Sequence, residues 1–299
     1  RKIICLPCSG FTGLSFSPQF LSMPELPEVE TLRRALLPLV INKTCTALKF
    51  YRKDIRFPIP QATLRKQMVN QVVSQIQRIG KYLLLKVPQG AMLLHLGMSG
   101  RVTLKTSMSP REKHTHAIFQ FDNDTFLHFV DPRRFGCILW VPQSGEHPLL
   151  DKLGPDPFSS DANAGAMKSL AKNCRSPIKT FIMDARRITG IGNIYACESL
   201  YLACINPKRK AGGVTLAEWD RLLSCVRSTL ENSIAAGGTT LRDFFDPSGT
   251  AGYYAVKLSV YGKEGDPCPK CKTSISRLVH SGRSTFFCKT CQPGSTQSK

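Results

Sequence analysis

A series of short β-like runs between residues 44 and 141 does most to narrow the folds open to this chain. Turn signals such as PQG, SPRE and DND separate neighbouring runs. The eight runs are TALKFY, VVSQIQRI, YLLLKV, AMLLHLGM, RVTL, AIFQFD, TFLHFV and CILWV. Strands that are so short and so closely spaced predict a β-sandwich or a β-barrel.

Helical patterns lie on both sides of the strands. Upstream, apolar residues recur at spacings of three and four from Leu26 to Val40, which predicts an amphipathic helix that Pro38 should end or kink. Downstream, residues 161–173, 193–203 and 215–236 are helix candidates. The last of these opens with TLAE, the spacing of a capping box.

We therefore expect an α+β protein built from several parts. A stretch dense in Pro, Gly and Ser, residues 142–161, is typical of a linker. The expected division is an N-terminal extension, a strand-rich domain, a helical domain and a cysteine-containing end. Their ranges are residues 1–22, 23–150, 151–237 and 238–299.

Two close cysteine pairs near the C-terminus predict a metal site. Cys268, Cys271, Cys288 and Cys291 form the pattern C-x2-C-x16-C-x2-C, which suits a closed tetrahedral site for one structural Zn²⁺. The alternative is four unrelated cysteines. RLVHS and RSTFF between the pairs predict a hairpin, and Arg283 near its tip would then have a fixed direction. The chain's eight other cysteines suggest no role.

The charge of the chain points to a polyanionic partner. Lys and Arg number 41 against 21 acidic residues, giving a net charge of +20. The excess is spread along the whole sequence, which favours nucleic acid over a single targeting tail, although a merely basic soluble protein is the alternative. No apolar run approaches the roughly 20 residues of a membrane span, so we expect a soluble globular protein.

Three glycine-containing motifs are candidates for DNA contacts. GIGN, ending at Asn193, opens a helix whose free N–H groups suit a phosphate, although ordinary helix-start chemistry explains it equally well. HLGMSG contains Met98, and DPRRFG contains Arg133 and Phe135. Apolar side chains beside arginine can fill the hole that an everted nucleotide leaves in a duplex. The alternative is that Met98 and Phe135 are core residues.

The stretch SMPELPEVETL places acidic residues and prolines at the start of the first helix. We favour Met23 as the true start, although residues 1–22 could belong to a targeting segment. Removal of Met23 would leave Pro24 with a free secondary amine that can attack an electrophilic carbon. Glu25 could then donate a proton to a sugar oxygen. The alternative is that Pro24 begins a helix and the glutamates complement its dipole.

Taken together, these motifs resemble the bacterial formamidopyrimidine-DNA glycosylase family over about residues 23–292. The matching motifs are MPELPEVET, IGKYLLL, HLGMSG, DPRRFG, LGPDPF, GIGNIYACESL and the cysteine pairs. The resemblance implies an N-terminal β-sandwich with an N-terminal helix, a helix–two-turns–helix domain and a C-terminal zinc ribbon. It implies base excision repair of oxidised purines, such as 8-oxoguanine and formamidopyrimidines, followed by β,δ-elimination at the abasic site.

The resemblance also assigns roles to individual residues. Pro24 would be the Schiff-base nucleophile, Glu25 the acid, and Lys81 a lysine near the lesion and its phosphates. Met98, Arg133 and Phe135 would fill the gap in the duplex. Asn193 and Arg283 would hold phosphates that flank the lesion, and residues 244–249 fall where the family has its lesion-covering loop.

The expected partner is double-stranded DNA with oxidised bases, and structural zinc is the expected metal. We expect a monomer without membrane contact in the cytoplasm, at the bacterial nucleoid, with organelle targeting by residues 1–22 left open. One alternative is an endonuclease VIII-like preference for oxidised pyrimidines. Leu26 in PELPE favours the branch of the family that prefers purines. A catalytically silent zinc-ribbon DNA-binding protein is the other, if Pro24 is not the free N-terminus.

Overall fold

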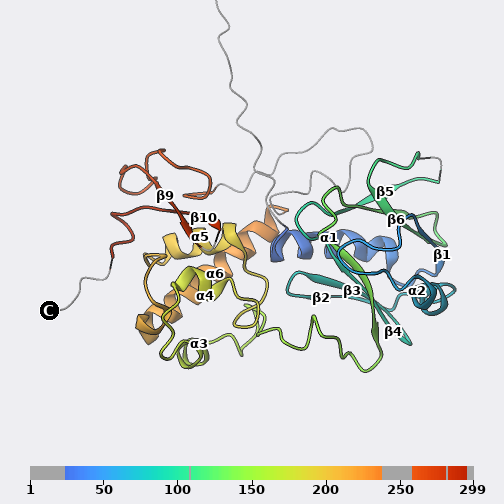
Figure 1. The fold of residues 1–299 in the computed structure, drawn as a ribbon, viewed down its shortest axis with the longest axis horizontal. Helices are drawn as coiled ribbons and strands as arrows, with labels where there is room; N and C mark the ends of the chain where they lie inside the picture. Colours follow the sequence, from blue (N-terminus) through green and yellow to red (C-terminus); the bar gives the residue numbers. More distant parts are fainter. Residues whose placement is uncertain (1–23, 108, 238–257, 281, 295–299) are drawn as a thin grey trace, which may run out of the picture.

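The computed structural model describes residues 24–107, 109–237, 258–280 and 282–294. The expected extension, Met23 and the expected lesion-covering loop at residues 244–249 lie outside these ranges. Figure 1 shows the first helix, α1, between a strand-rich part and a helical part, with a small hairpin beside the latter. No helix in the described ranges is long and apolar enough to cross a membrane.

The strand-rich part is a β-sandwich, which confirms one of the two architectures predicted for it. Its two four-stranded antiparallel sheets have the orders β1–β6–β7–β5 and β2–β3–β4–β8. The strands are β1 (Cys45–Phe50), β2 (Gln75–Ile79), β3 (Tyr82–Val87), β4 (Gly90–His95), β5 (Arg101–Lys105), β6 (Thr115–Phe121), β7 (Phe126–Val130) and β8 (Cys137–Pro142). One short helix that the sequence analysis did not predict, α2 (Gln61–Met68), packs through Leu64 and Met68 into the same core.

Helix α1 (Leu26–Val40) joins the two halves of the molecule. Most of its apolar face enters the sandwich core, whereas Leu26 packs in the core of the helical part. Pro38 does not end the helix, which continues through it to Val40, whereas the alternative that Pro38 kinks the helix stays a prediction. Pro38 lies in the last turn, where buried Leu36 and Val40 on either side hold the segment against the sheet.

The helical part contains α3 (Ala164–Leu170), α4 (Ile178–Ile182), α5 (Asn193–Leu202), the 3₁₀ helix η1 (Ala211–Gly213) and α6 (Leu216–Ala235). The helix expected at residues 161–173 is therefore shorter than predicted, because Asn163 caps its start and the chain turns after Leu170. The capping box of α6 is confirmed, with Thr215 and Glu218 bonded to each other's backbone.

The predicted hairpin near the C-terminus is confirmed as β9 (Ser276–His280) paired antiparallel with β10 (Arg283–Phe287). Phe286 of β10 shares a small core with Cys197 and Tyr201 of α5. The hairpin is thus attached to the helix that begins at GIGN.

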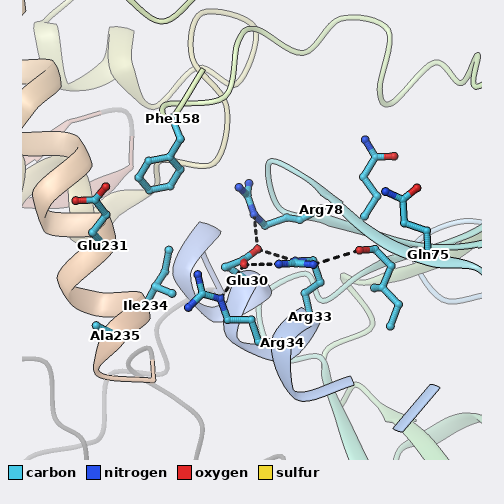
Figure 2. A pocket seen from close by; sticks show the side chains of 11 residues that line it. Glu30, Arg33, Arg34, Gln75, Arg78, Phe158, Glu231, Ile234 and Ala235 are labelled. Atoms are coloured by element: carbon cyan, nitrogen blue, oxygen red, sulfur yellow. Dashed lines mark hydrogen bonds and ion pairs between the residues drawn. The ribbon is translucent and has the colours of Figure 1, made fainter. Parts of the chain in front are cut away.

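A charge cluster ties the sandwich to the helical part (Figure 2). Glu30 of α1 accepts hydrogen bonds from Arg33 (2.8 and 2.9 Å), Arg34 (2.9 Å) and Arg78 (3.1 Å). Burial by itself would raise the pKa of Glu30, but the three arginines outweigh it and lower the pKa to about 2. Arg78 also donates to Asp156 at 2.8 Å. A cavity of about 630 Å³ adjoins this cluster, and none of the predicted site residues lines it.

Candidate active site and DNA interface

The Glu25 carboxylate lies at the N-terminus of α5. One oxygen accepts a hydrogen bond from the Gly192 N–H at 2.6 Å, and the other accepts from the Ile194 N–H at 2.9 Å. A Cβ at Gly192 would lie 2.2 Å from Glu25 Cδ, so only glycine permits this approach. One reading of GIGN predicted free N–H groups that suit a phosphate, but in the structure the Gly192 and Ile194 N–H groups hold the protein's own Glu25 carboxyl.

Burial gives Glu25 unusual acid–base properties. Its side chain is 1% exposed, and this burial is the main cause that raises its pKa to about 7. The positive charge of Lys81 and the two α5 N–H groups act in the opposite direction, while the charge of Glu28 adds to the rise. A carboxyl group with a pKa near neutrality can both donate and accept a proton.

Lys81 is brought close to Glu25 by the turn between β2 and β3. Burial lowers the pKa of the Lys81 ammonium, and the nearby charges of Glu25 and Glu28 oppose this shift. The preceding Gly80 has φ of +57°, and a Cβ there would lie 2.1 Å from Thr189 Oγ1. The glycine therefore lets the turn approach the helical part closely enough to place Lys81 at the site.

The chain around Pro24 is fixed by contacts that the sequence analysis did not foresee. The Glu25 N–H donates to Glu28 at 2.9 Å, and Leu26 N–H donates to a backbone carbonyl of the helical part at 3.1 Å. The Glu28 carboxylate also accepts a hydrogen bond from the Tyr195 hydroxyl at 2.7 Å, and this hydroxyl lies 2.6 Å from the Ser233 hydroxyl. Pro24, partly buried, thus directly precedes a segment whose backbone is fixed against the helical part.

Met98, Arg133 and Phe135 lie on two loops that pack together at one end of the sandwich. The Ser99 hydroxyl donates to Asp131 at 2.6 Å and accepts from the Arg133 N–H at 3.0 Å. Phe135 is 43% exposed and lies 5.0 Å from the Arg133 guanidinium, whereas Met98 is partly buried. Of the two readings, exposure favours a surface role for Phe135 over a core role.

Asn193 is the first residue of α5, but its side chain does not cap the helix. Its amide oxygen accepts from the Lys179 ammonium at 2.5 Å, and its amide nitrogen donates to the Ser284 carbonyl at 3.0 Å. Lys179, which is 1% exposed, also donates to Thr285 at 2.7 Å. Sequence reasoning missed this lysine, and its position in the apolar run PIKTFI was the available signal.

Arg283 begins β10 and is exposed. Its charge contributes to lowering the pKa of both Lys81 and Lys179, so it lies within electrostatic reach of both lysines. The hairpin therefore directs Arg283 toward the same region as the Lys81 turn.

The four predicted cysteine ligands converge. Their Sγ atoms all lie within 4.8 Å of one another, with Cys268 and Cys291 at 3.8 Å and Cys271 and Cys288 at 3.4 Å. Tetrahedral zinc with Zn–S bonds of about 2.3 Å requires sulfur atoms about 3.8 Å apart. This donor set fits one Zn²⁺ with no open position, as expected for a structural site.

Family models match most of the chain. The formamidopyrimidine-DNA glycosylase N-terminal domain matches residues 23–138, and the H2TH domain of the same enzyme matches residues 153–245. A zinc finger found in FPG and IleRS matches residues 265–294.

Individual relatives agree with these matches. Formamidopyrimidine-DNA glycosylase of Ruthia magnifica is 44% identical over 90% of this chain and 100% of its own length, and that of Shigella dysenteriae is 41% identical with the same coverage. The crystal structure of MutM (FPG) from Thermus thermophilus has a TM-score of 0.79 at 37% identity, covering 90% of this chain and 98% of its own.

A complex of a Lactococcus lactis FPG mutant with Fapy-dG-containing DNA has a TM-score of 0.82 at 30% identity, covering 91% of this chain and 100% of its own. The sandwich, the helical part and the cysteine hairpin occur in the order in which the family models match them. We conclude that the chain belongs to the formamidopyrimidine-DNA glycosylase family.

Proposed function

We propose that this protein excises oxidised purines from duplex DNA and then cuts the strand at the abasic site, using the Pro24 amine as nucleophile. The observation that carries the proposal is the buried carboxyl of Glu25, the residue that follows Pro24, with a pKa raised to about 7. The family likeness and the relatives bound to Fapy-dG and abasic DNA support the substrate class.

In this mechanism, the Pro24 nitrogen forms a bond to C1′ of the damaged nucleotide while the C1′–base bond breaks. The base leaves with the electron pair of that bond and takes up the proton that the Pro24 nitrogen loses. Protonated Glu25 gives its proton to the sugar ring oxygen, and the ring opens to an iminium. The iminium then permits β- and δ-elimination of the two flanking phosphates. Pro24 can act only when Met23 and all preceding residues have been removed.

The proposed DNA contacts follow from position and charge. Lys81 would lie at the lesion nucleotide, since the Glu25 carboxylate is its neighbour. Exposed Phe135, with Arg133 against its ring, and Met98 on the adjoining loop would fill the space left by the everted base. Arg283 would bind a flanking phosphate. Asn193 joins it in this role only if its side chain exchanges its present partners for the phosphate.

The zinc ion would hold the hairpin that carries Arg283. When bound to Cys268, Cys271, Cys288 and Cys291, it supplies stability to this small element and takes no part in the reaction. We also keep the four-part division at residues 22, 150 and 237 as a proposal, together with a monomer that acts in the bacterial cytoplasm at the nucleoid.

Borohydride trapping tests the proposal. The substrate is a duplex with one 8-oxoguanine opposite cytosine, and mass spectrometry of the same sample establishes its N-terminus. A covalent adduct at Pro24 is the expected result. If protein with a verified free Pro24 gives no adduct, a duplex with an oxidised pyrimidine is tested next. An adduct with that duplex alone would indicate the endonuclease VIII-like alternative, and none with either would indicate a silent DNA-binding protein.

A further inference from the structure

A second hollow lies away from the proposed active site, on the outer face of the sheet β1–β6–β7–β5. It has a volume of about 190 Å³ and lies between this face and the segment that follows β5. None of the predicted catalytic, DNA-binding or zinc-binding residues lines it. The polar lining residues are Lys49, Tyr51, Thr106, Ser107, Ser109, Arg111, Gln120 and His128, and none of the lining residues is acidic.

Strand register explains why polar residues gather there. Lys49 pairs with Ile118, Ile118 pairs with His128, and His128 pairs with Thr103, so these four residues form one row across the sheet. Alternate residues of a strand point to opposite faces. The neighbours of this row, such as Phe119, are packed in the sandwich core. The row itself therefore faces outward, beneath the segment after β5.

Two cations at the hollow have no carboxylate partner within the described ranges. Lys49 and Arg111 make no ion pair there, and the Arg111 guanidinium lies over the Tyr51 ring at 4.5 Å. Stacking of this kind leaves the guanidinium N–H groups at its edge free to donate. Glu112, the acidic residue on the covering segment, is already bonded to Lys105 at 2.6 Å and to Arg101 at 3.2 Å. The hollow thus presents uncompensated positive charge.

His128 supplies a buried polar group without a partner. Its side chain is 2% exposed, and its Nδ1 atom has no hydrogen-bond partner in the described part of the chain. Burial and the charge of Lys105 lower the pKa of His128, with Glu112 opposing them, so the ring is neutral at pH 7 and offers one N–H donor. A buried polar atom without a partner is costly, and a bound ligand or water would relieve that cost.

Two hydroxyls at the opening add a further donor. Thr106 Oγ1 and Ser109 Oγ lie 3.0 Å apart, and Ser109 Oγ also accepts from the Thr106 N–H at 3.2 Å. The pair of hydroxyls uses one of its two hydrogens for this contact, which leaves the other available to a ligand.

We propose that this hollow binds a phosphate group, through Lys49 and Arg111 with His128 and the Thr106–Ser109 hydroxyls as further donors. Its volume equals about six water molecules at roughly 30 Å³ each, so a phosphate with a short substituent fits. The phosphate comes either from free phosphate compounds or from a nucleic-acid backbone that extends past the active site.

The test is a titration of the whole protein with inorganic phosphate at constant ionic strength, in protein carrying ¹³C-labelled histidine. The His128 ring signals report on this hollow alone, which separates it from phosphate bound at Lys81 or Arg283. We expect a saturable shift, and at least about tenfold weaker binding in Lys49→Gln/Arg111→Gln. Lys66→Gln/Lys168→Gln removes two exposed cations elsewhere and serves as the matched control.

The proposal is overturned if the His128 signals do not saturate with phosphate, or if the double variant and its control bind phosphate equally. The single variants Lys49→Gln and Arg111→Gln repeat the measurement if the double variant does not fold. A duplex with an abasic-site analogue then identifies the source. Displacement of phosphate by the duplex assigns the site to the nucleic-acid backbone, and retention of phosphate assigns it to free phosphate compounds. Both results keep the phosphate site.

Discussion

Replacement of Glu25 by Gln should remove a pH dependence of folding stability that arises from the buried carboxyl. Glu25 has an ordinary pKa of 4.5 and a pKa of about 7 in the folded protein. Because the folded state holds its proton more tightly, stability is full below pH 4.5 and falls as the pH rises through 7. For this shift, the loss between pH 5 and 8.5 is about 2.5 kcal/mol.

The assay is urea unfolding of the wild type and Glu25→Gln at several pH values from 5 to 8.5. Groups that do not interact with Glu25 titrate alike in both proteins, so the difference between their free energies of unfolding reports on Glu25 and on the groups coupled to it, chiefly Lys81. That difference should change by about 2.5 kcal/mol in favour of the variant as the pH rises. Glu30→Gln is the control, because both the ordinary pKa of Glu30 and its folded value of about 2 lie below this window.

A constant difference between wild type and Glu25→Gln across the window would refute the reasoning. It would mean that the carboxyl stays ionised at pH 5 despite its burial, held by Lys81 and the two α5 N–H groups. Glu25 could not then act as a proton donor near neutral pH, and the proposed ring opening would need another acid.

Three further substitutions test the site. Pro24→Gly should retain DNA binding but slow strand cutting about a hundredfold, because a primary amine without the ring is less well positioned; unchanged gel-measured cutting would exclude Pro24. Cys268→Ser should weaken DNA binding at least about tenfold, measured by fluorescence anisotropy, because it loosens the hairpin. The control Cys225→Ser lies outside the cysteine cluster and should not weaken binding. Full DNA affinity after zinc chelation would contradict this link. Gly192→Ala places a Cβ 2.2 Å from the buried Glu25 carboxyl carbon and should slow base release about a hundredfold. In the control Gly213→Ala, the new Cβ has nothing within 4 Å, and the rate should not change. Equal single-turnover rates for the two variants would show that the close approach is unimportant.

Local patterns in the sequence were sufficient for much of the fold. Each of the eight runs became a strand, since a short β-like run bounded by turn residues is a signal carried by neighbouring residues. The capping box of α6 and the paired cysteines are equally local signals, because their geometry is set within a few residues. The helix did not end at Pro38, because burial of neighbouring residues outweighed the local helix-breaking tendency of proline.

The chemistry of the site depends instead on contacts between distant parts of the chain. Gly192 lies 167 positions after Glu25, and Thr285 lies 106 positions after Lys179. The sequence identified Glu25 as a candidate acid, but the pKa of Glu25 depends on its burial and on Lys81. Lys81 comes close to Glu25 only through the turn between β2 and β3. Residue types and local periods are written in the sequence, whereas desolvation and long-range hydrogen bonds exist only once the chain has packed.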